Sequence, residues 1–161
     1  MTQLIIEVKD GISAKLAELQ RRLNNPGPLM AGVAAELLSL TEEAFEREGV
    51  VGGDKWKKLA DSTIKQRAKK GHWPGKKLQV SAGGLAASIQ PFHSATQAGL
   101  SVSKPYAAIH QFGGKAGRGR KVEIPARPYL PMRKSGGDFE LTPKARSVLL
   151  EMMQDFVERG L

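Results

Sequence analysis

The sequence predicts an α+β fold, in which a small, mostly antiparallel sheet packs with about four helices in a single domain. Three observations predict this fold class. Apolar residues recur at helical spacing toward both ends of the chain, short alternating runs bounded by Gly and Pro lie between them, and no repeat or domain boundary interrupts the 161 residues. Because such a length is about one domain, we expect a single domain over residues 1–161.

The N-terminal part is predicted to contain one strand and two helices. Residues 4–8 alternate between apolar and mostly polar side chains, which is typical of a short half-buried strand. Leu and Ile at helical spacing then indicate an amphipathic helix over residues 12–23. The longest apolar stripe of the chain predicts a second helix that begins near Pro28 and ends near Gly49.

A basic helix and a loop are expected next. Residues 61–70 form a helical run that Asp61 or Ser62 would cap. Gly71, Pro74 and Gly75 interrupt any regular element that follows, so residues 69–77 include a mobile basic loop.

The centre of the chain is predicted to hold a hairpin and a short helix. The run GLAASI ends in a helical turn that leads into a strand over residues 89–93. Residues 99–103 alternate and are its expected antiparallel partner. Residues 106–113 place three large apolar side chains on one side of a short helix.

The last third is expected to contain a loop, an extended segment and a helix. Residues 113–121 hold only Ala116 as an apolar side chain, which is typical of a mobile loop. Val122 and Ile124 can begin a strand, but three prolines restrict residues 125–131 to an extended path. Thr142 is the expected N-cap of a terminal helix that reaches about residue 159.

The composition excludes several classes of protein. The chain has 40% hydrophobic and 25% charged residues, as in ordinary globular proteins. It has no apolar run of the ~20 residues that cross a bilayer, and its first residues show no basic segment before an apolar stretch, so we expect no signal peptide. The absence of cysteine excludes disulfides and thiolate zinc sites.

Positive charge is concentrated in the middle of the chain. Residues 52–81 carry nine basic and two acidic side chains, residues 104–134 carry eight and one, and residues 82–103 carry none, within a net charge of +9. Such a concentration attracts nucleic acid or an acidic protein surface. A merely solvated surface with long lysines has the same composition, so charge alone does not name a partner.

No arrangement of residues supports catalysis, a metal or a cofactor. His72, His93 and His110 are scattered, and none has a second ligand one helical turn away. The glycine-rich run 113–119 lacks the Gly-Lys-Ser/Thr of a phosphate-binding loop. We therefore expect a protein that is not an enzyme and needs no cofactor.

Three sequence segments together resemble the phage virion morphogenesis family, the tail-completion proteins of Mu-like and P2-like contractile-tailed bacteriophages. The segments are WKKLADSTIK from Trp56, GGLAASI from Gly83, and YAAIHQFGG from Tyr106 followed by IPARPYLP from Ile124. The last two motifs, close together and in this order, carry most of the resemblance. It covers the chain from about Trp56 to Leu130.

The resemblance implies a structural virion protein that acts late in assembly. Such proteins complete the tail and let a filled head join it, at the tail end or neck of a virion assembled in the bacterial cytoplasm. By analogy with other neck proteins, we expect a homo-oligomeric ring, with a hexamer favoured, that contacts other tail and neck proteins and no membrane. The alternative function is a sequence-independent nucleic-acid-binding module.

The motifs also suggest roles for individual residues. A rigid segment that carries Arg and Tyr suits an interface, although Arg127 and Tyr129 are equally compatible with contacts inside their own subunit. The long basic insertion between the motifs departs from the family pattern, and we hypothesise that it faces DNA in a ring lumen. The expected interface residues are His110, Gln111, Arg127 and Tyr129; the DNA-facing residues are Lys115, Arg118, Arg120 and Lys121; the core residues are Trp56, Leu85, Tyr106, Ile109 and Phe112.

Overall fold

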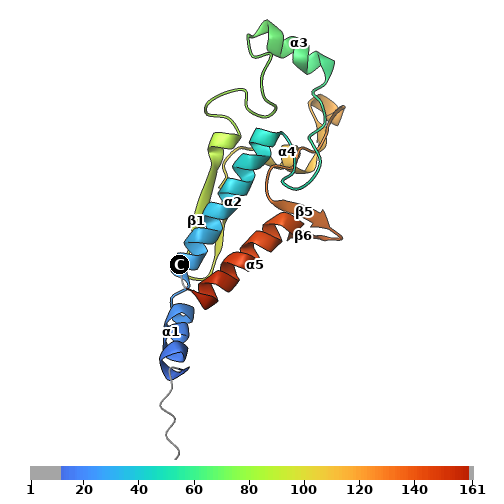
Figure 1. Ribbon diagram of the computed structural model, residues 1–161. Helices are drawn as coiled ribbons and strands as arrows, with labels where there is room; N and C mark the ends of the chain where they lie inside the picture. The colour runs from blue at the N-terminus through green and yellow to red at the C-terminus, as the bar shows by residue number, and fades with distance from the viewer. Residues whose placement is uncertain (1–11, 160–161) are drawn as a thin grey trace, which may run out of the picture.

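The computed structural model describes residues 12–159, and it confirms the α+β class (Figure 1). The strands of this described part form three separate antiparallel hairpins, where the sequence predicted one small sheet. The strand predicted over residues 4–8 lies outside the described residues. The elements are α1 (Ile12–Asn24), α2 (Gly27–Arg47), α3 (Asp61–Lys69), the 3-10 turn η1 (Ala86–Ser88), β1 (Ile89–His93), β2 (Ala98–Val102), α4 (Ala107–Phe112), β3 (Gly114–Ala116), the 3-10 turn η2 (Arg118–Arg120), β4 (Val122–Ile124), β5 (Met132–Ser135), β6 (Asp138–Leu141) and α5 (Pro143–Glu158).

Helix α2 is the central element of the molecule. It contacts the β1–β2 hairpin and α5, which flank it in Figure 1. The helix ends where Glu48 takes a left-handed conformation and its N–H bonds back to the last turn. Gly49 follows because a Cβ there would lie 2.7 Å from the carbonyl oxygen of Asp54, so no other residue fits without a shift of backbone.

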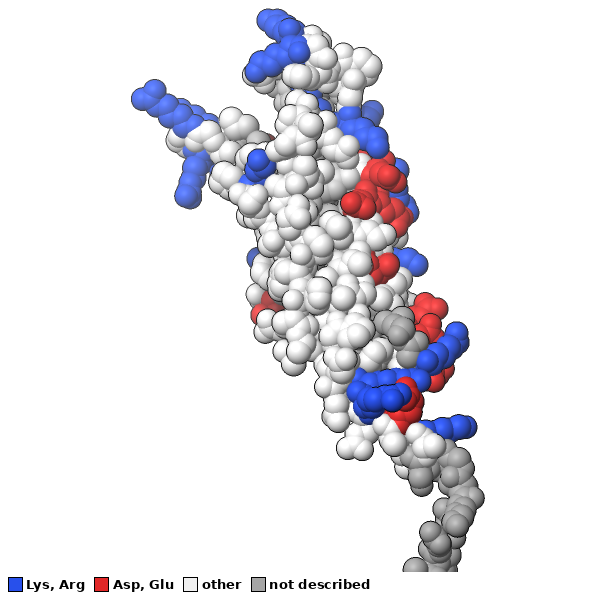
Figure 2. Space-filling view, turned by 90° about the vertical axis from the view of Figure 1, so that its left-hand side faces the viewer, with Lys and Arg blue, Asp and Glu red and all other residues white. Residues whose placement is uncertain are grey.

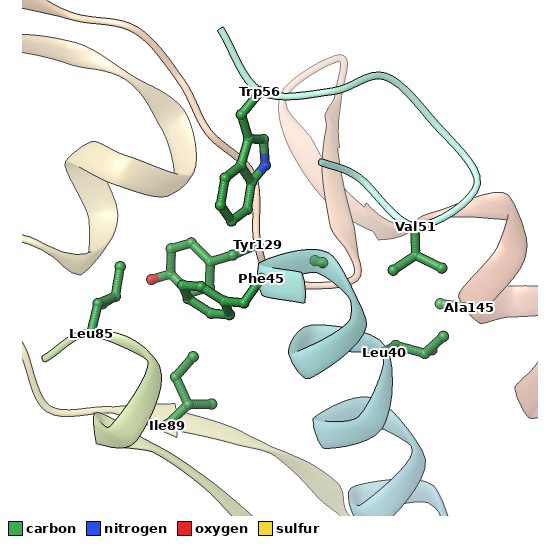
Figure 3. Close-up of a cluster of buried hydrophobic side chains, with 9 residues drawn as sticks. Leu40, Phe45, Val51, Trp56, Leu85, Ile89, Tyr129 and Ala145 are labelled. Carbon is green, nitrogen blue, oxygen red and sulfur yellow. The ribbon is translucent and has the colours of Figure 1, made fainter. Parts of the chain in front are cut away.

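One apolar core joins α2 to segments from most of the chain (Figure 3). The ring of Phe45 meets Trp56 edge-on at 5.6 Å and lies 5.4 Å from the tilted ring of Tyr129. Leu85 and Ile89 approach the same cluster from η1 and the start of β1. The buried members are Leu40, Ala44, Phe45, Val51, Trp56, Leu85, Ile89, Tyr129 and Ala145.

The helix predictions are confirmed, and one predicted cap is wrong. Helix α5 begins as expected, because the Thr142 hydroxyl accepts a hydrogen bond from the N–H of Ala145. Helix α3 covers residues 61–69, but its N-cap is Ala60 and neither Asp61 nor Ser62 caps it. Those two side chains lie inside the first turn, where they cannot accept from the N–H groups that a cap serves.

The glycine-rich segment after α4 forms a hairpin, where the sequence predicted a loop. Lys115 pairs with Glu123, and Ala116 with Val122, across β3 and β4. Gly113 makes the turn into β3 at φ 73°, and a Cβ there would meet the backbone N of Ala126 at 2.9 Å. The three residues of β3 pair with β4 through backbone groups, which needs few apolar side chains. Their polar composition therefore did not indicate a strand.

The β5–β6 hairpin, which turns at Gly136 and Gly137, has no counterpart in the sequence predictions. Its strands have only four residues each, and charged and apolar side chains alternate in β6 but not in β5. Within residues 12–159, no helix is long and apolar enough to cross a membrane, and no three potential ligand side chains cluster around a metal position.

Candidate interaction surfaces

The proline segment, residues 125–131, is held in place by the amide of Gln111. The Gln111 Oε1 accepts hydrogen bonds from the N–H groups of Tyr129 at 2.9 Å and Leu130 at 3.0 Å. Its Nε2 donates to the carbonyl of Met132 at 3.3 Å. A buried side chain from the short helix α4 thus satisfies two backbone groups of a segment whose prolines prevent ladder pairing, and one at the start of β5.

The segment before α3 holds the other side of the proline segment. The Arg127 guanidinium donates to the carbonyls of Lys57 at 3.2 Å and Lys58 at 3.0 Å. The indole N–H of Trp56 donates to the carbonyl of Pro128 at 2.7 Å. Burial, and then the nearby charge of Arg67, lower the pKa of Arg127. These bonds connect the motif that begins at Trp56 to the motif that begins at Ile124. Their acceptors are backbone carbonyls rather than carboxylates.

Three of the four expected interface residues are buried by their own chain. Gln111, Arg127 and Tyr129 are nearly inaccessible, and the Tyr129 hydroxyl donates to the carbonyl of Ala107. Burial raises the pKa of Tyr129 to about 12. These contacts lie inside one subunit, which is the alternative to an interface that the sequence left open. A role in an interface between subunits stays a prediction.

His110 is half-buried and differs from these three residues. Its carbonyl accepts from the N–H of Arg127 at 2.7 Å, and its ring meets Tyr106 edge-on at 5.8 Å. The Nδ1 atom is buried and has no hydrogen-bond partner among the described residues. Burial, and then the charge of Arg127, lower the pKa of the imidazole. The neutral ring is therefore the favoured form.

The expected core residues divide into two groups. Trp56 and Leu85 are buried, and Ile109 is half-buried. Tyr106 and Phe112 are 42% and 45% exposed, so the prediction that they belong to the core is wrong. The reason is the length of α4: six residues present only one narrow face to the domain, and Gln111 occupies it.

Phe112 instead lines an apolar cleft that the sequence did not reveal. Its ring lies 5.0 Å from Phe139 of β6, which is 53% exposed. The cleft has a volume of about 790 Å³ and runs between the loop after α2, α4, the β5–β6 hairpin and the start of α5. Lys134 and Lys144 are among its lining residues. Detecting it required the position of the unpredicted β5–β6 hairpin.

The charged residues are unevenly distributed over the surface. In Figure 2, Lys and Arg gather at the end that carries α3, both signs of charge alternate along one side and at the opposite end, and the broad area that faces the viewer is almost free of charge. The four predicted DNA-facing residues are exposed on η2 and the β3–β4 hairpin, and none forms an ion pair within residues 12–159; they are Lys115, Arg118, Arg120 and Lys121. The structure therefore brings them together as one exposed basic hairpin, residues 114–124.

The sequence matches the model of the phage virion morphogenesis family over residues 8–158. The chain belongs to this family. The match includes every described element from α1 to α5, so the buried contacts around Gln111 and Arg127 lie within the family domain. No solved structure matches the chain significantly.

Two relatives support the assignment to this family. The chain is 37% identical to Mu-like prophage FluMu G protein 2 of Haemophilus influenzae over 158 residues, which are 98% of this chain and 97% of that protein. It is 41% identical to the putative capsid assembly protein G of Escherichia phage Mu over 106 residues, which are 65% of this chain and 67% of that protein. The role of a family member is in phage virion morphogenesis, and the resemblance seen in the motifs is confirmed.

Proposed function

We propose that this protein is a non-enzymatic structural component that completes the tail and enables the head to join it. The observation that carries the proposal is the family match over residues 8–158. The surfaces are compatible with assembly, since Phe112 and Phe139 are exposed at an apolar cleft between α4 and the β5–β6 hairpin. The phage Mu relative is named for capsid assembly, so an earlier role is the competing possibility.

Electron microscopy of lysates from the parent phage with an early stop codon in this gene tests the proposal. We expect DNA-filled heads together with separate, unjoined or overlong tails. Complementation with the intact gene is the control and restores joined particles. Missing or malformed heads contradict tail completion and favour the capsid role, and normal infectious particles contradict both.

The working form in the proposal is a ring at the tail end or neck, with a hexamer favoured, bound to other tail and neck proteins. A ring needs a head-to-tail contact, in which two different surface patches of each subunit meet. Symmetry analysis of the neck region in images of purified virions tests this. Six-fold density that accommodates this chain supports the ring, and a single copy per particle contradicts it.

The basic hairpin, residues 114–124, is proposed to face DNA in the lumen of that ring. Its four basic side chains are exposed and free of ion pairs within the described residues, which leaves their charge available to phosphates. Neutralising Lys115, Arg118, Arg120 and Lys121 together is expected to reduce infectivity. The matched control neutralises four exposed basic residues on α1 and at α5, outside the apolar cleft: Lys15, Arg21, Arg146 and Arg159. Equal infectivity of the two variants contradicts the proposal.

The same exposed charges favour a second candidate, a sequence-independent nucleic-acid-binding module. Binding of the isolated protein to duplex DNA at increasing salt discriminates the two functions. Tight binding that weakens steeply with salt, and a slope that falls by roughly one for each phosphate contact removed, favour this candidate. Weak DNA binding with stoichiometric binding to a tail or neck protein favours assembly.

A further inference from the structure

The β1–β2 hairpin has hydrogen bonds at both ends that fix which peptide groups face inward. The N–H of Ser94 donates to the carbonyl of Gln97 at 2.7 Å, and the N–H of Ser103 donates to the carbonyl of Ser88 at 3.4 Å. In an antiparallel pair, hydrogen-bonded and non-hydrogen-bonded positions alternate. The two bonds therefore place every second residue between them in an inward-facing, bonded position.

The alternation leaves an unpaired row of backbone groups on the outer edge of β2. Because Ser101 and Gly99 are the bonded positions of β2, the N–H and C=O groups of Ala98, Leu100 and Val102 point away from β1. No other strand pairs with β2 in the described residues, and none of these three residues has a backbone bond outside the hairpin. Such an edge is a template for another strand.

The outer edge of β1 differs in one residue. Pro91 is opposite Leu100, so its position is also an outward-facing one. Proline has no N–H, and the middle of that edge therefore lacks a donor. Only the edge of β2 offers an unbroken row of donors and acceptors. Two hairpins of this kind can join in a continuous sheet only through β2 on both sides.

The hairpin face is also the part of the molecule on which two copies do not repel each other. The chain carries a net charge of +9, but residues 82–103 contain no charged side chain. Figure 2, which faces the side of the molecule where β1 lies in Figure 1, shows a broad area that is almost free of charge. Phe92 on this face is 49% exposed, and its ring covers Gly99. An uncharged edge suits a second copy better than it suits DNA or an acidic partner.

We propose that two copies of this chain pair antiparallel through their β2 strands, about a two-fold axis at Leu100. In this register Leu100 faces its own counterpart, and Ala98 of each copy faces Val102 of the other. Each of these three pairings exchanges two backbone hydrogen bonds, so all the outward groups are satisfied. The product is a four-stranded sheet with β1 at each outer edge, where Pro91 stops further addition.

This inference goes beyond the proposed function. A two-fold contact joins two copies and no more, so it does not build a ring and leaves the ring contacts to other faces. It supplies a dimer that covers the open edge when the protein is free. Failure of the dimer would leave the tail-completion experiment unaffected, and the converse also holds.

Spin labels on the full-length protein test the geometry. The chain has no cysteine, so Ser101→Cys and Gln90→Cys each give one label, on exposed positions opposite each other in the hairpin. With strands about 4.8 Å apart, the Cα atoms of the two copies would lie about 8 Å apart at position 101 and about 16 Å apart at position 90. Dipolar broadening and pulsed distance measurements at ~100 µM protein, where a micromolar dimer is populated, compare the two positions. A shorter distance at 101 than at 90 supports the pairing.

Absence of coupling in both variants, or a distance at 90 that equals or falls below that at 101, overturns the proposal. Ala98→Pro gives a second test, because it removes an outward N–H and none of the bonds to β1. We expect sedimentation equilibrium to show weaker dimerisation of this variant, with Ala98→Ser, which keeps the N–H, as the control. Equal association of the two variants, with folded circular dichroism spectra, also overturns the proposal.

Discussion

The amide of Gln111 and the guanidinium of Arg127 share a task, which is to satisfy backbone groups that no sheet or helix satisfies. Prolines at 125, 128 and 131 keep the segment between them out of a ladder. Its N–H and C=O groups are nevertheless buried, and buried backbone groups need partners. Gln111 reaches two of its N–H groups from α4, whereas the Arg127 guanidinium, which belongs to the segment, serves the carbonyls of Lys57 and Lys58 before α3. The burial of the Gln111 amide is therefore a consequence of the prolines.

Gln111→Met is expected to destabilise the fold by about 2–3 kcal/mol, because it keeps the length of the side chain but leaves the buried N–H groups of Tyr129 and Leu130 without an acceptor. Urea unfolding measures the change. Gln154→Met, at an exposed position of α5, is the control and is expected to change stability by less than about 0.5 kcal/mol. A similar loss in both variants would contradict the role given to Gln111.

Tyr129 makes stability depend on pH in the alkaline range. Its pKa is raised from 10.0 to about 12, because burial disfavours the phenolate. The unfolded chain therefore releases this proton first, so the stabilisation is complete below pH 10 and is lost as the pH rises toward 12. Urea unfolding between pH 9 and 12 is expected to show a steeper loss in the wild type than in Tyr129→Phe. Parallel curves would show that the tyrosine does not contribute.

His110 has the opposite dependence, on the acid side. Burial and Arg127 lower its pKa below 6.5, so protonation favours the unfolded chain. Its contribution to stability is present above pH 6.5 and is lost as the pH falls through the lowered pKa. We expect His110→Gln to lose less stability than the wild type between pH 7 and pH 5, as measured by thermal unfolding. A larger loss of stability in His110→Gln than in the wild type would contradict the role of His110 protonation.

The residue scale is also where sequence reasoning was least complete. It selected Gln111, Arg127 and Tyr129 as functional, and the structure gives each a partner inside the chain. It placed Tyr106 and Phe112 in the core from their spacing alone. Spacing on a helix shows which residues share a face, but it does not show what that face meets. Both outcomes depend on contacts between residues distant in sequence.

At the scale of elements, patterns of eight residues or more predicted the structure well. The bounds of α2 and α5 follow from long apolar stripes and from punctuation by proline, glycine and threonine. The β1–β2 hairpin, whose strands have five residues each, follows from the helical turn that leads into residue 89 and from the alternating run 99–103. The hairpins β3–β4 and β5–β6 have strands of three or four residues, which are too short for a period-two pattern to stand out.

The N-cap of α5 provides a test at this scale. Thr142→Ala is expected to cost about 1 kcal/mol, because the N–H of Ala145 loses its acceptor in a buried position. Chemical denaturation measures the difference, and Thr96→Ala, at an exposed position in the β1–β2 turn, is the control. Thr142→Ser keeps the hydroxyl and is expected to recover most of the loss. Equal stability of the alanine and serine variants would contradict the cap.

At the scale of the whole molecule, the chain arranges its interaction surfaces around one central helix. The hairpin β1–β2 and α5 flank α2 (Figure 1), and the basic hairpin, the apolar cleft and the uncharged hairpin face are separate. The sequence predicted the fold class and the concentration of charge. It did not predict the cleft, because a cleft is formed by elements that only the folded chain brings together.

The bonds that hold the proline segment also influence the order of folding. The bond from Trp56 to Pro128 joins positions 72 residues apart, and the bond from Arg127 to Lys57 joins positions 70 apart. Each hairpin closes a loop of only a few residues, so closing it costs little entropy and occurs early in folding. Closing the long loops costs more entropy, so the bonds across them form late. We expect the native contacts of the proline segment to form after the transition state of folding. Trp56→Phe should then accelerate unfolding and leave the folding rate almost unchanged, which stopped-flow measurements at several urea concentrations would show.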